Sequence, residues 1–172
     1  ELMPNSNWML LPNIEKDIYQ YIKNWNLNAF ILSGGEDYGI SKERDNTEKL
    51  IFEYSQKNSL PILGICRGFQ SIYKRLGGDF EKKGNNFSSF HSSTRHQIVV
   101  NNGINEVNSY HSNALIEISK PQKLNVIARC KQDNTIEAFE GENILGFMWH
   151  PEREKKFNEW DAKKIKRLFK YE

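Results

Sequence analysis

Residues 61–73 read Pro61-Ile62-Leu63-Gly64-Ile65-Cys66-Arg67-Gly68-Phe69-Gln70-Ser71-Ile72-Tyr73. The first five residues are an apolar run typical of a buried strand, and the apolar residues after Cys66 recur at helical spacing. Gly64 and Gly68 flank the cysteine two residues away on either side. A nucleophile on a sharp strand-to-helix turn needs this spacing, because larger side chains there would clash with the strained backbone. We therefore predict that Cys66 is a nucleophile at such an elbow.

The surroundings of Cys66 suit a reactive thiol. A helix N-terminus favours the thiolate, and the backbone N–H of Arg67 follows directly as a donor for a developing oxyanion. The alternative is a buried cysteine that only happens to lie between two turn glycines. Cys130 ends an apolar run without glycine neighbours, so we expect it to be a packed core thiol.

A thiol nucleophile needs a base and a third group that orients the base. His150 follows the apolar run Ile144–Met148, and Glu152 lies two residues further along. Residues two apart on an extended chain share a face, and Pro151 biases His150 towards that form. The alternative is a structural histidine at a strand end. The position and the nearby glutamate favour a catalytic Cys66, His150 and Glu152.

The remaining histidines are His91, His96 and His111. Their spacing fits no common zinc pattern, and no second pair of cysteines accompanies them. We expect surface or loop-packing roles for all three, and neither a metal nor another cofactor in the mechanism.

Outward from the elbow, strands and helices alternate towards the N-terminus, which is typical of a parallel sheet with crossover helices. Asn13 is predicted to cap a first helix, and Asp45 with Glu48 to form the capping box of a second. The remaining predicted strands and helices are Trp8–Leu11, Ala29–Leu32, Gln97–Val100, Leu124–Cys130, Ile136–Glu140, Ile144–Met148 and a helix over Glu159–Tyr171.

Together these segments predict a three-layer, flavodoxin-like α/β domain with an antiparallel extension after Gly78 and a hairpin turn at 141–143. We expect one domain over residues 1–172. The net charge is +2 and no basic face stands out, so we expect no nucleic-acid partner. No apolar run is long enough to span a bilayer, and two unrelated cysteines give no disulfide framework, which favours a cytoplasmic protein. A homo-oligomer is left open.

Three segments in this order carry a resemblance to a known family: Ser33-Gly34-Gly35-Glu36-Asp37, residues 64–70 and His150-Pro151-Glu152. The chain resembles class I glutamine amidotransferases, and in particular their γ-glutamyl hydrolase branch, peptidase family C26. Arg44-Asp45 and residues 108–111 extend the resemblance over nearly the whole chain.

The resemblance implies a Cys66–His150–Glu152 triad and an oxyanion hole from the N–H groups of Gly35 and Arg67. It implies that Gln70 and the backbone around Ser109, Tyr110 and His111 bind the γ-glutamyl group of a small substrate. Two departures stand out. Family members begin with a further strand and helix, so we expect the printed chain to lack an N-terminal stretch. Ser112-Asn113 also follows His111 where the branch commonly has glutamine.

The reaction implied is hydrolysis of a γ-glutamyl amide through a thioester. Within the branch the chain resembles hydrolases that act on a γ-glutamyl-CDP-amidate in the synthesis of capsule phosphoramidates, and γ-glutamyl-γ-aminobutyrate hydrolysis is the alternative. A glutaminase subunit feeding a synthetase and a catalytically inactive scaffold are the other functions considered. Five basic positions are candidates for binding the leaving group: Lys82, Lys83, Arg95, Arg129 and Arg153.

Overall fold

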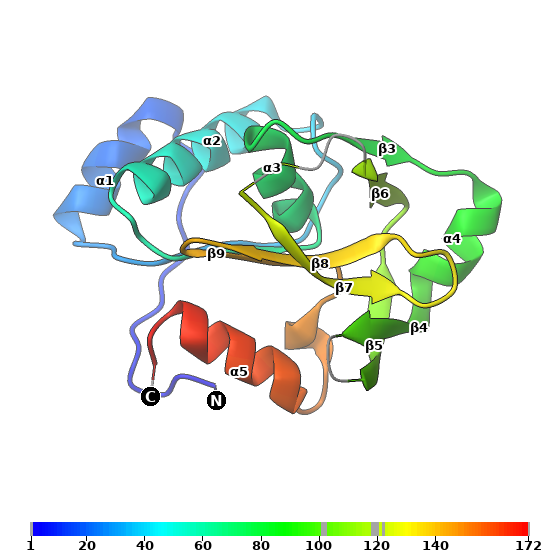
Figure 1. Ribbon diagram of the computed structural model, residues 1–172. Coiled ribbons are helices and arrows are strands. Elements are labelled where there is room, and N and C mark those ends of the chain that lie inside the picture. Colours follow the sequence, from blue (N-terminus) through cyan, green and yellow to red (C-terminus); the bar gives the residue numbers. More distant parts are fainter. Residues whose placement is uncertain (1, 101–102, 118–120, 122, 172) are drawn as a thin grey trace.

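A seven-stranded mixed sheet separates two layers of helices in the computed structural model, which describes residues 2–100, 103–117, 121 and 123–171 (Figure 1). The strands are β1 (Phe30–Leu32), β2 (Ile62–Ile65), β3 (Phe80–Lys82), β4 (Ser92–Val100), β5 (Gly103–Tyr110), β6 (Asn113–Leu115), β7 (Asn125–Cys130), β8 (Ile136–Gly141) and β9 (Ile144–Phe147). The helices are α1 (Ile18–Asn24), α2 (Lys42–Lys57), α3 (Arg67–Arg75), α4 (Asn85–His91) and α5 (Glu159–Leu168), with short 3-10 helices η1 (Glu15–Asp17) and η3 (Pro151–Arg153).

The large sheet has the order β1-β2-β9-β8-β7-β4-β5. Strands β1, β2 and β9 are parallel to one another. Strands β8, β7, β4 and β5 follow β9 in the sheet, and each pairs antiparallel with its neighbour. Strand β2 therefore lies beside β9, with Ile65 opposite Phe147. Because both strands run the same way, their carboxyl ends meet at one edge of the sheet, the place where open α/β sheets bind ligands.

Each face of the sheet is covered by its own apolar core. Helices α1, α2 and α3 lie on one face and α5 on the other (Figure 1). On the first face Phe69 of α3 stacks on Phe139 of β8, with ring centroids 4.4 Å apart. On the second face Ile165 of α5 packs with Phe147 and Trp149. Two cores on a shared sheet are the three-layer arrangement that the sequence predicts, and the antiparallel extension and the hairpin at 141–143 are confirmed as well.

Three predictions at the N-terminal side are wrong. Residues 8–11 form no strand, and Leu10 is 95% exposed, because this apolar run has no neighbouring strand among the described residues to pair with. The first α-helix begins at Ile18 after η1, with no side-chain cap from Asn13. Helix α2 begins after Ser41, whose hydroxyl oxygen accepts from the Arg44 N–H at 3.3 Å. Asp45 and Glu48 therefore lie inside the helix.

The sequence prediction also missed β3 and α4, which lie between Gly78 and Gln97, and β5, which forms a hairpin with β4. Strands β3 and β6 pair as a separate two-stranded sheet, and α4 leads directly into β4. These segments are short and rich in Ser, Asn and Lys, so hydrophobic periodicity gives little signal there.

Candidate active site

Cys66 lies at the predicted strand-to-helix elbow. It is the residue before α3, and its backbone has φ 51° and ψ −102°, a conformation that side chains rarely adopt. Its N–H donates to the Phe147 carbonyl of β9 at 2.8 Å. A Cβ atom at Gly68 would lie 1.9 Å from the Leu32 carbonyl oxygen, and one at Gly64 would lie 2.7 Å from the Gly68 backbone. The elbow is thus confirmed, and both glycines are required by close backbone contacts.

The thiol of Cys66 is buried, and burial outweighs the helix terminus. Burial raises the pKa of Cys66 to about 11, although the N–H of Arg67 and the charge of Arg153 act to lower it. The pKa of Cys130 is also raised to about 11 by burial. The expected preference for a free thiolate is therefore wrong for the resting protein, and the thiol needs a base that takes its proton during attack.

His150 follows β9 and is held at both its backbone and its ring. The Asn108 side chain of β5 donates to the His150 carbonyl at 2.8 Å and accepts from its N–H at 3.0 Å. The ring Nδ1 lies 2.6 Å from Oε1 of Glu152. With Nδ1 engaged, Nε2 is the ring nitrogen that remains to accept a proton. Nothing in the sequence pattern singled out Asn108 for this role.

The contact between His150 and Glu152 arises differently from the prediction. The His150 backbone has φ −111° and ψ 86°, outside the extended region, and Pro151–Arg153 form the 3-10 helix η3. A tight turn, and not a continuing strand, brings the carboxylate back to the ring. Burial acts to raise the pKa of Glu152, but the hydrogen bond with His150, a backbone hydrogen bond and the charges of His150 and Arg153 together outweigh it, so that the pKa lies below its ordinary value. The carboxylate is therefore charged at neutral pH.

The loop after β1 packs directly on the His150 ring. A Cβ atom at Gly34 would lie 2.5 Å from Cε1 of His150, so only glycine allows this approach. Gly35 has φ 143°, and a Cβ there would lie 2.4 Å from Nη1 of Arg44. Nη2 of Arg44 donates to the carbonyls of Ser33 and Gly34, at 2.9 Å and 3.1 Å. The structure thus brings the expected oxyanion-hole residue Gly35 into the loop beside the base.

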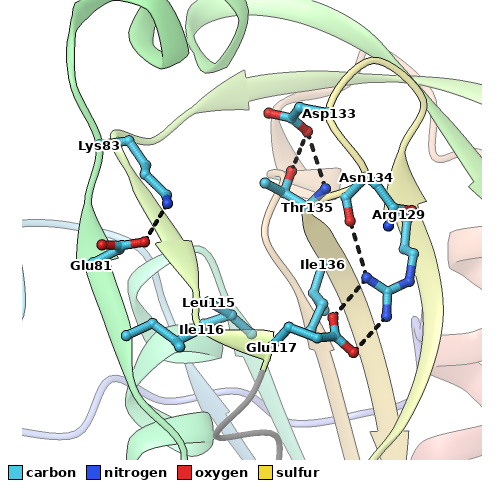
Figure 2. Close-up of a pocket in the computed structure, with 10 residues that line it drawn as sticks. All are labelled: Glu81, Lys83, Leu115, Ile116, Glu117, Arg129, Asp133, Asn134, Thr135 and Ile136. Atoms are coloured by element: carbon cyan, nitrogen blue, oxygen red, sulfur yellow. Dashed lines mark hydrogen bonds and ion pairs between the residues drawn. The ribbon is translucent and has the colours of Figure 1, made fainter.

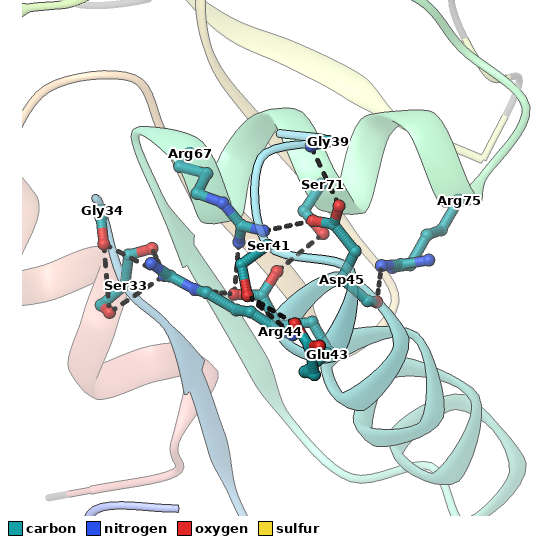
Figure 3. Close-up of polar contacts among 11 residues, drawn as sticks. Ser33, Gly34, Gly39, Ser41, Glu43, Arg44, Asp45, Arg67, Ser71 and Arg75 are labelled. Carbon is teal, nitrogen blue, oxygen red and sulfur yellow. Dashed lines mark hydrogen bonds and ion pairs between the residues drawn. The ribbon is translucent and has the colours of Figure 1, made fainter. Parts of the chain in front are cut away.

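Arg67 lies at the centre of a buried ionic network that joins α2, α3 and this loop (Figure 3). Its guanidinium donates to Asp45 and Glu48 of α2. Glu48 also accepts from Nε of Arg44 at 2.8 Å and from the Ser71 hydroxyl at 3.1 Å. The side chain of Arg67 therefore braces the elbow, which leaves its backbone N–H as the part that faces the thiol.

The expected substrate-binding residues divide into two groups. Tyr110 is partly exposed, and its ring lies 5.7 Å from that of His150, edge to face. Gln70 is buried, and its Oε1 accepts from Nδ2 of Asn113 at 3.2 Å. Ser109 and His111 are buried as well, and the Ser109 hydroxyl donates to the His91 carbonyl at 2.7 Å. The side chains of Ser109 and His111 are turned into the protein, away from Tyr110.

Most of the basic candidates already have acidic partners. Arg95 pairs with Glu106 and Glu154, Arg129 with Glu117, Lys82 with Asp37 and Lys83 with Glu81. Among the described residues Arg153 has no ion pair within 4 Å, and its guanidinium carbon lies 4.5 Å from the centre of the Tyr110 ring. Arg153 is exposed beside the proposed base, so its charge is available to a ligand.

A hollow of about 520 Å³ lies elsewhere, between β3, β6 and the β7–β8 turn (Figure 2). Its lining includes the ion pairs Lys83–Glu81 and Arg129–Glu117, but none of the residues expected to be catalytic. Paired charges leave little net attraction for an anionic ligand. We therefore do not assign this hollow to the substrate.

Surface or loop-packing roles were expected for three histidines, and the surface part of this expectation is wrong. His91, His96 and His111 are all buried, and each has a ring nitrogen within 3.6 Å of Glu137 on β8. Sequence spacing alone does not show this, because the residues come together only through the pairing of β4 with β5 and the packing of α4 on β4.

In the described part of the chain, no helix is both long and apolar enough to cross a bilayer.

Sequence comparisons find a matching family and several relatives of this chain. A family model described as Peptidase C26 matches residues 8–152. A γ-glutamyl-CDP-amidate hydrolase from Campylobacter jejuni is 33% identical over 161 residues, which cover 88% of this chain and 75% of that protein. A GMP synthase from Petrotoga mobilis is 32% identical over 147 residues, covering 79% of this chain but 27% of that enzyme.

Solved structures show the same fold. A Thermoplasma acidophilum protein described as part of a GMP synthase superposes with a TM-score of 0.71 at 20% identity, covering 95% of this chain and 79% of that one. A likeness at this identity supports the fold alone. The likeness agrees with the three-layer α/β arrangement.

Proposed function

The chain belongs to the peptidase C26 family, and from this we propose that it is a cysteine hydrolase that cleaves a γ-glutamyl amide and releases glutamate. One observation carries the proposal beyond the family. The strained elbow at Cys66 is hydrogen-bonded to the end of β9, and the same strand leads directly to the paired His150 and Glu152. Cys66 is the proposed nucleophile, His150 the base and Glu152 the residue that orients it.

In the proposed first step the thiol sulfur attacks the γ-carbonyl carbon while Nε2 of His150 takes the thiol proton. The carbonyl oxygen becomes an oxyanion, for which the N–H groups of Arg67 and Gly35 are the proposed donors. Because burial raises the pKa of Cys66 to about 11, proton transfer has to accompany attack. His150, held by Glu152 and by Asn108, is the proposed acceptor.

In the second step the tetrahedral intermediate collapses, the carbon–nitrogen bond breaks and His150 protonates the leaving nitrogen. A γ-glutamyl thioester of Cys66 remains. A water molecule, deprotonated by His150, then attacks the thioester carbonyl, and the carbon–sulfur bond breaks to give glutamate and the free thiol. The residues named here perform this sequence without a metal ion.

We propose that the leaving group carries phosphate, as in γ-glutamyl-CDP-amidate, which would place the reaction in capsule phosphoramidate synthesis. Support comes from the Campylobacter relative and from Arg153, the candidate cation without an acidic partner among the described residues. A guanidinium binds phosphate oxygens through paired hydrogen bonds.

The proposed location of the enzyme is the cytosol. Cys66 and Cys130 form no disulfide, which suits that compartment.

Glutamate release from a panel of γ-glutamyl amides tests the function. We expect kcat/KM for γ-glutamyl-CDP-amidate to exceed that for glutamine by about 100-fold, equivalent to about 2.7 kcal/mol of transition-state binding. The variant Cys66→Ala should lose turnover and keep its circular dichroism spectrum, whereas Cys130→Ala should keep turnover. Normal activity of folded Cys66→Ala would rule out the mechanism.

The variant Arg153→Gln tests the leaving group separately. It should lower kcat/KM for the CDP-amidate by about 10-fold or more and leave that for γ-glutamyl-γ-aminobutyrate nearly unchanged, because only the first substrate carries phosphates. Arg95→Gln is the matched control, since Arg95 is exposed but already paired. Equal losses on both substrates would contradict the phosphate contact. Preference of the wild type for the aminobutyrate amide would favour the alternative hydrolase.

A glutaminase that supplies ammonia to a synthetase is the second function considered. The similarity to GMP synthases favours it, although the matched region is a minor part of those enzymes. Comparable rates on glutamine, together with a synthetase that co-purifies with the chain, would support this function over the first.

A further inference from the structure

Four buried side chains from four segments meet behind the proposed active site. They are His91 at the end of α4, His96 in β4, His111 after β5 and Glu137 in β8. Their side chains are at most 2% exposed. We call these four residues the histidine cluster. A carboxylate buried this completely needs a compensating positive charge, because the desolvation of a lone ion costs several kcal/mol.

Each histidine turns one ring nitrogen towards Glu137. Nδ1 of His91 and Nε2 of His96 lie 3.5 Å from its oxygens, and Nε2 of His111 lies 3.6 Å away. These distances are too long for strong charged hydrogen bonds, which measure about 2.7–2.9 Å. Within the described residues, the three nitrogens and Oε2 of Glu137 have no hydrogen-bond partner. Such a group of unsatisfied buried polar atoms requires an explanation.

The other ring nitrogen of each histidine is anchored. Nε2 of His91 lies 2.9 Å from Asp133, Nδ1 of His111 lies 2.9 Å from the Asn113 carbonyl, and Nδ1 of His96 lies 3.3 Å from the Phe90 carbonyl. Carbonyl and carboxylate oxygens accept hydrogen bonds, so these outer nitrogens carry the protons. In a neutral ring the inner nitrogen then presents its lone pair. Histidine ligands of metal ions are held in this way.

The spacing of the inner atoms fits a metal ion. Tetrahedral zinc binds nitrogen and oxygen at about 2.0–2.1 Å, which separates neighbouring ligand atoms by about 3.4 Å. The inner nitrogens lie 3.5–3.6 Å from the Glu137 oxygens, and the ligand atoms of His91, His111 and Glu137 all lie within 4.8 Å of one another. Direct ion pairs with imidazolium rings would draw the atoms closer.

We propose that the histidine cluster binds one Zn²⁺ ion through the three inner nitrogens and the Glu137 carboxylate. Cys130 is the rival ligand, since its sulfur lies within 4.8 Å of a ring nitrogen of His91 and of a ring nitrogen of His96. Its thiol instead donates to Oε1 of Gln132 at 3.2 Å, and a set without Glu137 would leave the buried carboxylate uncompensated. Three histidines and one carboxylate fill all four positions, and a zinc site without an open position is structural and not catalytic.

The ion would fasten the wall of the proposed active site to the sheet. The Ser109 hydroxyl and the His111 N–H both donate to the His91 carbonyl, at 2.7 Å and 2.9 Å. The Glu137 carbonyl accepts from the Met148 N–H at 2.8 Å, two residues before His150. Loss of the ion should therefore loosen the segment that carries Tyr110, while the proposed chemistry at Cys66 itself needs no metal.

Metal analysis of the purified protein is the direct test. Grown with added zinc, the chain should hold about one equivalent by inductively coupled plasma mass spectrometry. Removal with a chelator should lower the melting temperature, and added Zn²⁺ should restore it. If the purified protein holds no zinc, and neither chelator nor added Zn²⁺ changes its melting temperature, the proposal is overturned. That result would favour a cluster of imidazolium rings around Glu137. Both measurements use the wild type, so they do not depend on whether a variant folds.

Variants then test the ligand set. His111→Ala and the more conservative Glu137→Gln should reduce bound zinc to well below 0.2 equivalents, whereas Cys130→Ser and Cys66→Ala should keep about one. X-ray absorption should show zinc with nitrogen and oxygen neighbours at about 2.0–2.1 Å and no sulfur at about 2.3 Å. A sulfur neighbour, or loss of zinc in Cys130→Ser with retention in His111→Ala, would overturn the proposed ligands. None of these readouts depends on the substrate.

Discussion

At the scale of single residues, the site depends on contacts that leave no room for another atom. Gly34 lies against the His150 ring, Gly64 against the Gly68 backbone and Gly68 against the Leu32 carbonyl. Asn108 holds both polar groups of the His150 backbone. The proposed catalytic groups are thus positioned before any substrate binds, which lowers the entropic cost of reaching the transition state.

The change Gly68→Ala should destabilise the fold by about 3 kcal/mol or more, because the new methyl group would lie 1.9 Å from the Leu32 carbonyl oxygen. Backbone of α3 and β1 would have to separate. Gly84→Ala is the control, since nothing lies within 4 Å of a Cβ there, and it should change stability by less than about 0.5 kcal/mol. Urea denaturation of both variants measures the difference. Equal stability of the two would contradict the contact.

The change Glu152→Gln should lower kcat by roughly 10²-fold and alter KM much less, because the proposed role of Glu152 is to orient His150 and to stabilise its protonated ring. Steady-state kinetics on the best γ-glutamyl amide checks this. Glu106 is the exposed partner of Arg95, and the control variant Glu106→Gln should leave both kcat and KM unchanged. An unchanged kcat in Glu152→Gln would mean that another group holds the base.

At the scale of helices and strands, the ionic network between α2 and α3 explains why the predicted capping box of Asp45 and Glu48 is wrong. Asp45 and Glu48 have the spacing of a capping box, yet both bind Arg67 from inside α2. Local spacing cannot separate the two roles, because the partner lies on another helix. The strands around the elbow were predictable, since their apolar runs are uninterrupted; β3, β5, β6 and α4 were not, because their positions depend on partners far along the chain.

The same limit applies to the site. The chain segments of the proposed triad were found because each follows an apolar strand directly. The roles of Asn108, Arg44 and Glu137 were not predicted, because they depend on strand register and helix packing. Burial of three histidines around Glu137 follows from the pairing of His96 with Val107 between β4 and β5, which no single segment specifies.

The change Glu48→Gln should cost about 3–5 kcal/mol of folding stability, since it leaves the buried Arg67 and the partly buried Arg44 without their shared carboxylate. The matched control is Glu53→Gln on the same helix, where the pair with Lys49 is exposed and 3.9 Å long. That variant should change stability by less than about 1 kcal/mol. Urea denaturation followed by circular dichroism compares them, and similar midpoints would contradict a structural role for the network.

At the scale of the whole molecule, α5 covers one face of the sheet and buries an acidic group beneath it. Asp161 is 2% exposed, and its carboxylate accepts from the Trp149 ring N–H at 3.1 Å. Burial raises the pKa of Asp161 from 3.8 to about 6, although this hydrogen bond acts to lower it. The folded protein therefore holds the proton more tightly than the unfolded chain does.

A carboxyl group with a raised folded-state pKa stabilises the fold fully below pH 3.8, and this contribution is lost as the pH rises to about 6. At about 1.4 kcal/mol per pH unit, the loss amounts to roughly 3 kcal/mol. Asp161→Asn keeps an acceptor for Trp149 but cannot ionise. We expect it to be more stable than wild type at pH 7, by up to roughly 3 kcal/mol, with the gain shrinking towards pH 4.

Urea denaturation at pH 4.5 and pH 7 measures this difference. Glu159→Gln, on the exposed side of the same helix, should follow the wild type at both pH values. A variant Asp161→Asn that is less stable than wild type at pH 7 would show that the charged carboxylate is stabilised by its surroundings.

The parallel pairing of β2 with β9 also has a consequence for the order of events during synthesis. Cys66 and His150 lie at the ends of neighbouring strands, but the ribosome makes the whole antiparallel extension between them. A growing chain therefore displays the thiol long before its base exists, and the pairing that joins them is a contact of high sequence separation, which forms slowly. On the proposed mechanism, hydrolysis can begin only after the last strand has entered the sheet, because only then does Cys66 have both its elbow and its base.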